Sequence, residues 1–399
     1  MKVKSLHGGT ITSPKGFLAG ATSAGLKKKG GLDLGILYSE VPCVAAGVFT
    51  ANRVKAAPVL WSQQRIASKR AQAFVVNSGC ANACTGEQGL RDTAQVAGLT
   101  ARKLGLSVDD VLVASTGVIG ERLPVEMVAH GIEKLRLSRD GGGELARAII
   151  TTDTGTKEMA AVVEGSGVTV GGIAKGAGMI HPNLATLLCF LTTDAAVDAD
   201  FLDRVLREAV DISFNMVTVD GDTSPNDTVL ILANGRAGNR EIRDGSADAA
   251  GFRQALVDVC IYLARRIAAD GEGATRLIEV TVEGAANVSD ARLAARTIAG
   301  SPLVKTAVHG CDPNWGRIVA AAGRSGAEVD GAKIALYLNG ICLMDGGSPV
   351  PFDRDRVKAA MGSKEVPIRV CLNIGDATAT AWGCDLTAEY VAINSEYTT

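Results

Sequence analysis

A threonine that follows a small residue and begins an apolar run can attack the peptide bond that precedes it. Thr186 stands in this position, directly after Ala185 and at the start of the apolar run 187–192. Attack of its hydroxyl on the Ala185 carbonyl would convert the peptide bond to an ester, which water would then cleave. The freed amine, with an ordinary pKa of about 8, is a suitable general base for the hydroxyl of the same residue. The segment therefore predicts self-cleavage before Thr186, followed by acyl transfer through its hydroxyl.

The neighbours of Thr186 favour this chemistry over simple strand propensity, which alone would explain a threonine at the start of a strand. Gly176 and Gly178 lie in a glycine-rich loop that can hold a strained turn, and Lys175 supplies a positive charge a few residues away. The mechanism needs no histidine. His181 also lies nearby, and we expect it to have a structural role in the turn.

The tetrahedral intermediate of such an attack carries a negative oxygen that needs fixed hydrogen-bond donors, each worth roughly 3 kcal/mol. Thr116 and Gly117 follow the apolar run 111–114, so they offer a hydroxyl and a backbone N–H at the end of a predicted strand. The same residues fit an ordinary exit from a strand into a turn. The sequence leaves both interpretations open.

The elements that must position these residues are short β-branched or apolar runs separated by glycines, with amphipathic segments between some of them. Strands are predicted at 73–76, 111–114, 168–173, 187–192, 229–232, 277–282, 334–338 and 368–374. Helices are predicted at 90–104, 200–212 and 251–269. Strands and helices that alternate in this way indicate the α/β or α+β class, with mixed sheets and flanking helices.

The composition argues against several classes of protein. The 399 residues carry 41 basic and 43 acidic side chains and only 4% aromatic residues, so the chain lacks the features of a nucleic-acid-binding protein. The run Lys27–Lys29 before two glycines is more typical of a solvated turn. The first residues hold no apolar signal segment, and no apolar stretch is long enough to span a bilayer, so we expect a cytoplasmic enzyme.

Motifs for common cofactors and metals are missing. The nine cysteines contain no CxxC pair, and we expect them to be mostly buried apolar residues without a metal. The acidic loop 220–227 departs from EF-hand spacing because Pro225 stands where the loop glycine belongs. We interpret it as a turn that braces the site through Asn215, Asp220 or Asp222. No dinucleotide, ATP or zinc motif occurs, so no cofactor is expected.

With these residues in view, the chain resembles the ornithine acetyltransferases, also called glutamate N-acetyltransferases. The segment KGAGMIHPNLATLLCFLTTDA at 175–195 is similar to the self-cleavage segment of that family. Further motifs resemble family motifs in the same order: GVFTANRVKAAPV (47–59), NSGCANACTG (77–86), STGVIG (115–120), TTDT (151–154), FNMVTVDGDTSPNDT (214–228), DGEGAT (270–275), DPNWGR (312–317) and AWGCDLTAEYV (381–391). The likeness covers essentially the whole chain. One departure is Cys80, where the family is expected to carry Asn, with the loss of a local hydrogen bond and no effect on activity.

The resemblance implies roles for individual residues. The nucleophile is Thr186, and the oxyanion hole is formed by Thr116 and Gly117. The residues implied to bind substrate are Thr152, Lys175, Thr186, Glu272, Asn394 and Thr399, with Thr151 as the alternative to Thr152. Lys175 suits a carboxylate and Glu272 an ammonium group, although each alone would be an ordinary exposed loop charge. Asn394 and Thr399 require the C-terminal tail to fold back into the site.

The resemblance also implies a reaction. Acetyl passes from N2-acetylornithine to Thr186 and then to glutamate in a ping-pong sequence that belongs to arginine biosynthesis. Some family members also accept acetyl from acetyl-CoA, as a substrate and not a cofactor. Two alternatives remain open. A self-processing aminopeptidase or amidohydrolase would pass the acyl group to water, and a glycine-rich structural protein would stay uncut.

The implied architecture is a layered α/β sandwich of the ornithine acetyltransferase and self-processing aminopeptidase type. An alpha fragment, residues 1–185, and a beta fragment, residues 186–399, would share one core, with the cut at a buried strand edge. Two copies of each fragment would form a heterotetramer.

Overall fold

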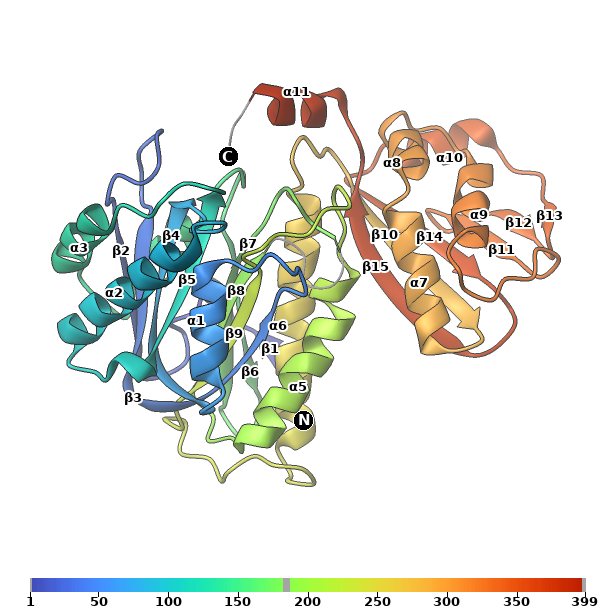
Figure 1. Cartoon of the computed structure of the whole chain (residues 1–399). Helices are drawn as coiled ribbons and strands as arrows, with labels where there is room; N and C mark the ends of the chain where they lie inside the picture. Colours follow the sequence, from blue (N-terminus) through green and yellow to red (C-terminus); the bar gives the residue numbers. More distant parts are fainter. Residues whose placement is uncertain (1, 182–186, 397–399) are drawn as a thin grey trace.

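The larger of two β-sheets contains strands from both sides of the predicted cut. The computed structural model describes residues 2–181 and 187–396 (Figure 1). Within them the strand order is β1-β6-β7-β8-β9-β3-β4-β5, and β2 pairs with β3 beside this path. The strands are β1 (Val3–Ser5), β2 (Phe17–Thr22), β3 (Leu34–Phe49), β4 (Arg70–Cys80), β5 (Val111–Val118), β6 (Lys157–Val163), β7 (Thr169–Lys175), β8 (Leu188–Thr193) and β9 (Thr228–Ala233). The antiparallel pair β7 and β8 flanks the predicted cut.

The large sheet bends so that its two halves face each other. Phe74 of β4 stacks on Phe190 of β8 with ring centroids 4.1 Å apart, although β3 and β9 lie between these strands in the sheet. Successive residues of a strand point to opposite faces. Phe190 therefore fills the inner core between the two halves, whereas its neighbours Cys189 and Leu191 join the core on the outer face. The long strand β3 makes the bend, because it pairs first with β2 and β4 and later with β9.

Helices cover both outer faces and complete a four-layered α-β-β-α sandwich. The outer faces carry α5 (Ala199–Ile212) and α6 (Ala249–Ala269) on one side and α1 (Ala57–Ile66), α2 (Gly86–Leu104) and α3 (Val125–Lys134) on the other (Figure 1). The short helix α4 (Gly142–Ile149) contributes Leu145 and Ile149 to the inner core. This arrangement confirms the predicted layered α/β sandwich with mixed sheets and flanking helices.

A second sheet forms a smaller lobe, at the right of Figure 1. Its strand order is β13-β12-β11-β14-β10-β15. The strands are β10 (Leu277–Ala285), β11 (Ala335–Leu338), β12 (Ile341–Asp345), β13 (Ser348–Pro349), β14 (Glu365–Cys371) and β15 (Ala377–Cys384). The helices of this part are α7 (Val288–Ala299), α8 (Pro302–His309), α9 (Trp315–Gly323) and α10 (Arg354–Met361). The last helix, α11 (Ala388–Glu396), lies apart from this lobe, at the top of Figure 1. Helix α6 packs against strands of both sheets, so one hydrophobic core runs through both lobes.

Every predicted strand and helix overlaps an observed element of the same type. Five of the nine cysteines are buried, as expected of small apolar residues.

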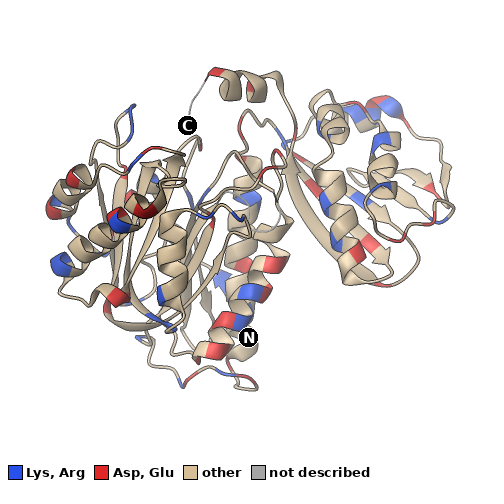
Figure 2. Ribbon diagram, in the orientation of Figure 1, with Lys and Arg blue, Asp and Glu red and all other residues tan. Residues whose placement is uncertain are grey.

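Charges of both signs are interspersed along the exposed side of α5, where Arg207 lies 2.9 Å from Asp203 (Figure 2). Among the helices in the described ranges, none combines the length and the apolar character needed to cross a bilayer.

Candidate active site

Six of the residues expected to act or bind line one small cavity of about 100 Å³. The six are Thr116, Gly117, Thr152, Lys175, Glu272 and Asn394. The other lining residues are Ile119, Thr151, Gly178, Met179, Ser224 and Asn226. Both threonines of the TTDT motif line the cavity, so the alternative between Thr151 and Thr152 stays open. The remaining predicted residues, Ala185, Thr186 and Thr399, lie outside the described residues.

Lys175 and Thr116 form a buried polar pair in this cavity. Lys175 ends β7, and its Nζ donates a hydrogen bond to the Thr116 Oγ1 at 3.3 Å. An ammonium group has donors only, so the threonine oxygen accepts this bond and its own proton remains available. Thr116 can therefore direct a hydroxyl proton at an oxygen atom in the cavity, as an oxyanion hole requires.

Gly117 occupies a backbone position that only glycine can fill. Its φ is +131°, a value that residues with a side chain rarely adopt. A Cβ atom here would lie 2.3 Å from the carbonyl carbon of Gly79 and 2.6 Å from the nitrogen of Cys80. Cys80 itself is buried, and its Sγ lies 3.5 Å from the Glu121 carbonyl oxygen, to which it donates a weak hydrogen bond.

A buried ion cluster, defined here as Asp153, Lys157 and Asp270, joins segments that are distant in sequence. The Lys157 Nζ lies 2.7 Å from the Asp153 Oδ1 and 2.6 Å from the Asp270 Oδ2. The Asp153 carboxylate also accepts hydrogen bonds from the backbone N–H groups of Thr151 at 3.0 Å and Gly176 at 2.7 Å. The cluster therefore holds the TTDT segment and the loop after α6 against the residue that follows Lys175.

Burial and neighbouring charges oppose each other at this cluster. Burial penalises the charge of Asp153, but Lys175 and Lys157 outweigh the penalty and hold the pKa of this carboxyl at about 2. At Lys175, burial lowers the pKa of the ammonium below its ordinary value, and Asp153 offsets part of this effect. The charged form of Lys175 therefore depends on the carboxylate beside it.

Glu272 reaches the cavity from the turn after α6, and the C-terminal helix contacts it there. The Glu272 N–H donates to the Ala177 carbonyl at 2.9 Å, and the Glu272 Oε2 accepts a hydrogen bond from the Asn394 Nδ2 at 2.8 Å. A Cβ atom at Gly178 would lie 2.5 Å from the Glu272 carboxyl carbon, so a larger residue here would force this carboxylate to move. Helix α11 thus folds back over the cavity, as the role expected of Asn394 requires.

The acidic loop 220–227 holds both ends of the segment that contains the predicted cut. The Asp220 carboxylate accepts from the N–H groups of Met179 at 2.6 Å and Ile180 at 2.8 Å. On the other side, the Leu187 N–H donates to the Asp227 Oδ1 at 3.1 Å. Of the three residues expected to brace the site, Asp220 makes these contacts. The Asn215 Nδ2 donates to Asp211, and the Asp222 N–H donates to Asp220.

Asp227 and His181 are two further titratable residues beside the segment that contains the predicted cut. Asp227 is buried, and its burial raises the pKa of the carboxyl well above the ordinary value. Its Oδ2 has no hydrogen-bond partner in the part of the chain that the structure describes. His181 places its Nδ1 3.2 Å from the Thr218 Oγ1, so its contact is with a segment 37 residues away and not within its own turn.

Sequence reasoning did not single out Asp153, Lys157 or Asp227. The signal for Asp153 and Asp227 lies in their motifs, TTDT and FNMVTVDGDTSPNDT, whose acids are now seen to hold backbone N–H groups. Nothing local marks Lys157, because its two partners are brought to it only by the tertiary fold.

A model of the ArgJ family matches residues 18–399 of this chain. The chain belongs to the ArgJ family. Two relatives called arginine biosynthesis bifunctional protein ArgJ are each 54% identical to it. The one from Dehalococcoides mccartyi aligns over 99% of this chain and 98% of its own length, and the one from Symbiobacterium thermophilum over 98% and 99%. A crystal structure of the ArgJ protein from Bacillus halodurans is 46% identical, with a TM-score of 0.52, and covers 52% of this chain and 98% of the solved chain.

Membership of the ArgJ family confirms the resemblance drawn from the motifs, and with it the prediction of an acetyltransferase of arginine biosynthesis. The described residues contain no group of three or more His, Cys, Asp or Glu side chains that could hold a metal ion.

Replacing Asp153 tests the buried ion cluster. Asp153→Asn should lower the free energy of unfolding by about 3–5 kcal/mol, because it leaves Lys157 buried without one of its charged partners. Urea unfolding at neutral pH measures this change. As a control, Asp203→Asn removes an exposed partner of Arg207 and should cost at most about 0.5 kcal/mol. Equal losses of unfolding free energy in the two variants would contradict the role of Asp153 in a buried ion cluster.

The same carboxyl should make stability sensitive to acid. Its folded pKa of about 2 lies below the ordinary value of 3.8, so its contribution is present above pH 3.8 and is lost as the pH falls towards 2. The difference is worth about 2 kcal/mol. Asp153→Asn should therefore lose less stability than the natural protein between pH 4 and pH 2, as measured by the midpoint of thermal unfolding.

Proposed function

We propose that the protein transfers acetyl from N2-acetylornithine to glutamate through an ester on Thr186. The observation that carries this proposal is the presence of one cation and one carboxylate, Lys175 and Glu272, in the small cavity that also contains Thr116 and Gly117. N2-acetylornithine has a carboxylate and a side-chain ammonium group. Each of these two groups finds a partner of opposite charge in the cavity.

Several observations support a cut before Thr186. Leu187, the residue that follows Thr186, is held by Asp227, and Met179 and Ile180 are held by Asp220 of the same loop. The solved ArgJ chain from Bacillus halodurans is almost fully aligned yet covers only 52% of this chain, which is close to the share that residues 186–399 represent. We therefore propose fragments 1–185 and 186–399, with two copies of each in a heterotetramer.

The proposed reaction has two half-reactions. The amine of Thr186 takes the proton of the Thr186 hydroxyl as this oxygen attacks the acetyl carbonyl, and Thr116 and Gly117 stabilise the negative oxygen that forms. The C–N bond then breaks, and the proton passes to the ornithine amine. The amine of glutamate attacks the resulting ester, which releases N-acetylglutamate and restores the hydroxyl.

The buried surroundings suit an amine that acts as a base. Burial lowers the pKa of the Lys175 ammonium and raises the pKa of the Asp227 carboxyl, so the surroundings of both groups disfavour charge. Burial of an amine disfavours its charged form, and the neutral form is the one that accepts a proton. Acetyl-CoA as a second acetyl donor and a cytoplasmic location are further parts of this proposal.

Intact-mass measurement of the denatured protein tests the cut and its position together. The natural protein should give two fragments that end at Ala185 and begin at Thr186, whereas Thr186→Ala should give one chain of 41.1 kDa with no acetyl transfer. Thr281→Ala, in the second sheet, serves as a control that should be cut normally. An uncut protein with full transfer activity would exclude the mechanism.

Two substitutions at the carboxylate end of the cavity test substrate binding. Glu272→Gln removes the partner of the ornithine ammonium, and Gly178→Ala pushes the same carboxylate aside. Both should lower kcat/KM for N2-acetylornithine about tenfold or more, the effect of losing ~1.4 kcal/mol. The kcat/KM for glutamate should fall less, because its side chain carries no ammonium group. Gly323→Ala, where no atom lies within 4 Å of the added carbon, is the control. Equal losses for the two substrates would refute the role of Glu272.

A further inference from the structure

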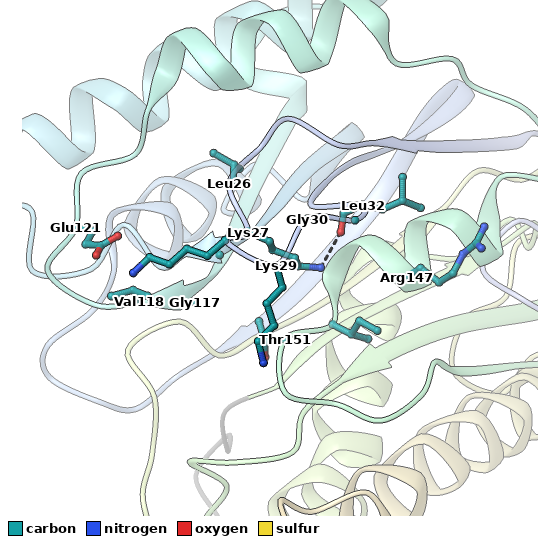
Figure 3. Close-up of a pocket in the computed structure, with 14 residues that line it drawn as sticks. Leu26, Lys27, Lys29, Gly30, Leu32, Gly117, Val118, Glu121, Arg147 and Thr151 are labelled. Atoms are coloured by element: carbon teal, nitrogen blue, oxygen red, sulfur yellow. Dashed lines mark hydrogen bonds between the residues drawn. The ribbon is translucent and has the colours of Figure 1, made fainter. Parts of the chain in front are cut away.

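A second and larger cavity adjoins the small cavity lined by Thr116, Gly117, Lys175 and Glu272, which we call the acyl-transfer cavity. Its volume is about 500 Å³, in the range of sites that bind small molecules, and it shares Gly117 and Thr151 with the smaller cavity. The remaining lining residues are residues 26–32 of the β2–β3 loop, Gly79, Val118, Glu121, Arg147 and Ile150 (Figure 3). We call it the lysine-loop cavity.

Basic residues outnumber acidic ones in the lysine-loop cavity, whereas the chain as a whole is nearly balanced. Four basic residues line it, against one acidic residue, Glu121, whereas the whole chain has 41 basic and 43 acidic residues. The basic residues are Lys27, Lys28, Lys29 and Arg147. The lining also includes the apolar residues Leu26, Leu32, Val118 and Ile150. This lining suits an anion that also carries an apolar part.

The β2–β3 loop that carries the lysines is held by its own hydrogen bonds. The buried Asp33 carboxylate accepts from the backbone N–H groups of four successive residues, Ala24 to Lys27, at 2.6 to 3.2 Å. The Lys27 Nζ donates to the Leu32 carbonyl oxygen at 2.7 Å. The run was expected to be a solvated turn. Lys28 and Lys29 are indeed exposed, but the loop also forms the wall of a cavity.

The loop is also fixed relative to the acyl-transfer cavity. Gly79 has a φ of +101°, and a Cβ atom there would lie 2.7 Å from the Leu26 carbonyl oxygen, so the loop rests directly on this glycine. Gly79 is the register partner of Gly117 in the pair β4 and β5. The lysines therefore occupy a defined position beside the predicted oxyanion hole.

We propose that the lysine-loop cavity binds the phosphate groups of a phosphorylated acyl donor, whose flexible arm carries an acyl thioester towards Gly117. The inference rests on the proposed function, since it places a second donor at the same acyl-accepting threonine. Acetyl-coenzyme A has this chemistry, with a diphosphate and a phosphomonoester for the cations and an arm for the apolar wall. N2-acetylornithine does not require these cations, because Lys175 and Glu272 already match its two charges.

The transfer from this donor balances in the same way as the first half-reaction. The Thr186 oxygen forms a bond to the acetyl carbonyl carbon, and the C–S bond of the thioester breaks. The thiol leaves with the proton that the Thr186 amine took from the hydroxyl. The acetyl ester is the same intermediate, so glutamate completes the reaction unchanged.

A double variant, Lys28→Gln with Arg147→Gln, tests the phosphate site. Both side chains are exposed and lie outside the smaller cavity, so the fold and the transfer from N2-acetylornithine should be retained. The KM for acetyl-CoA should rise about tenfold or more, since loss of ~1.4 kcal/mol of phosphate binding has this effect. Arg356→Gln with Lys358→Gln, in α10 of the other lobe, makes the same charge change as a control.

Binding of free coenzyme A separates this inference from the proposed function. Calorimetric titration of the Thr186→Ala protein needs no catalysis, and coenzyme A should bind it and bind about tenfold more weakly after the double change. Absence of binding to Thr186→Ala, or equal binding with and without the double change, would overturn the inference. So would a double variant that raises the KM for glutamate instead. Failure of transfer from N2-acetylornithine would count against the proposed function alone.

Discussion

The site depends on one buried electrostatic contact, the ion cluster of Asp153, Lys157 and Asp270. The side chains of Lys157 and Asp153 are 1% and 0% exposed, so both charges have lost almost all contact with water. Removing one partner of such a pair costs far more than replacing the whole pair by apolar residues. The main role of the cluster is therefore to position the segments it joins, and not to stabilise the fold. It brings the TTDT motif, the residue after Lys175 and the loop that carries Glu272 to one point.

Local sequence patterns were sufficient to predict the strands and helices, and to place Thr116 and Gly117 of the cavity lining. The strands on either side of the predicted cut, β7 and β8, show as apolar runs because both faces of the large sheet are buried. Thr116 and Gly117 follow the apolar run 111–114 after one residue, so their place at a strand end could be inferred. Lys175 and Glu272 could be assigned only through the family resemblance, because a single charged loop residue has no distinctive pattern.

The contacts between distant segments could not be inferred in this way. Strand β3 has to bend for Phe74 and Phe190 to meet, and neither residue indicates locally which partner it will find. Lys157 lies only four residues after Asp153, yet its other partner, Asp270, lies 113 residues away. In the sequence, the three lysines of the β2–β3 loop are typical of a solvated turn. Only the tertiary structure shows that this loop packs on Gly79. Each of these features depends on the tertiary fold and not on local propensity.

The second lobe contributes to the active site by positioning helix α11, which carries Asn394. Among the described residues that line the acyl-transfer cavity, Asn394 is the only one that follows the six-stranded sheet. Asp385, directly after β15, accepts from the N–H groups of Thr275 at 2.7 Å and Arg276 at 2.8 Å, which joins the end of this sheet to its beginning.

Two residues later, the Thr387 Oγ1 donates to the Gly273 carbonyl oxygen at 2.8 Å, next to Glu272. Helix α11 has no buried residue, so hydrophobic packing does little to hold it. Its position is set instead by these hydrogen bonds and by the bond from Asn394 to Glu272. The carboxylate expected to bind the substrate ammonium is thus oriented by the far end of the chain.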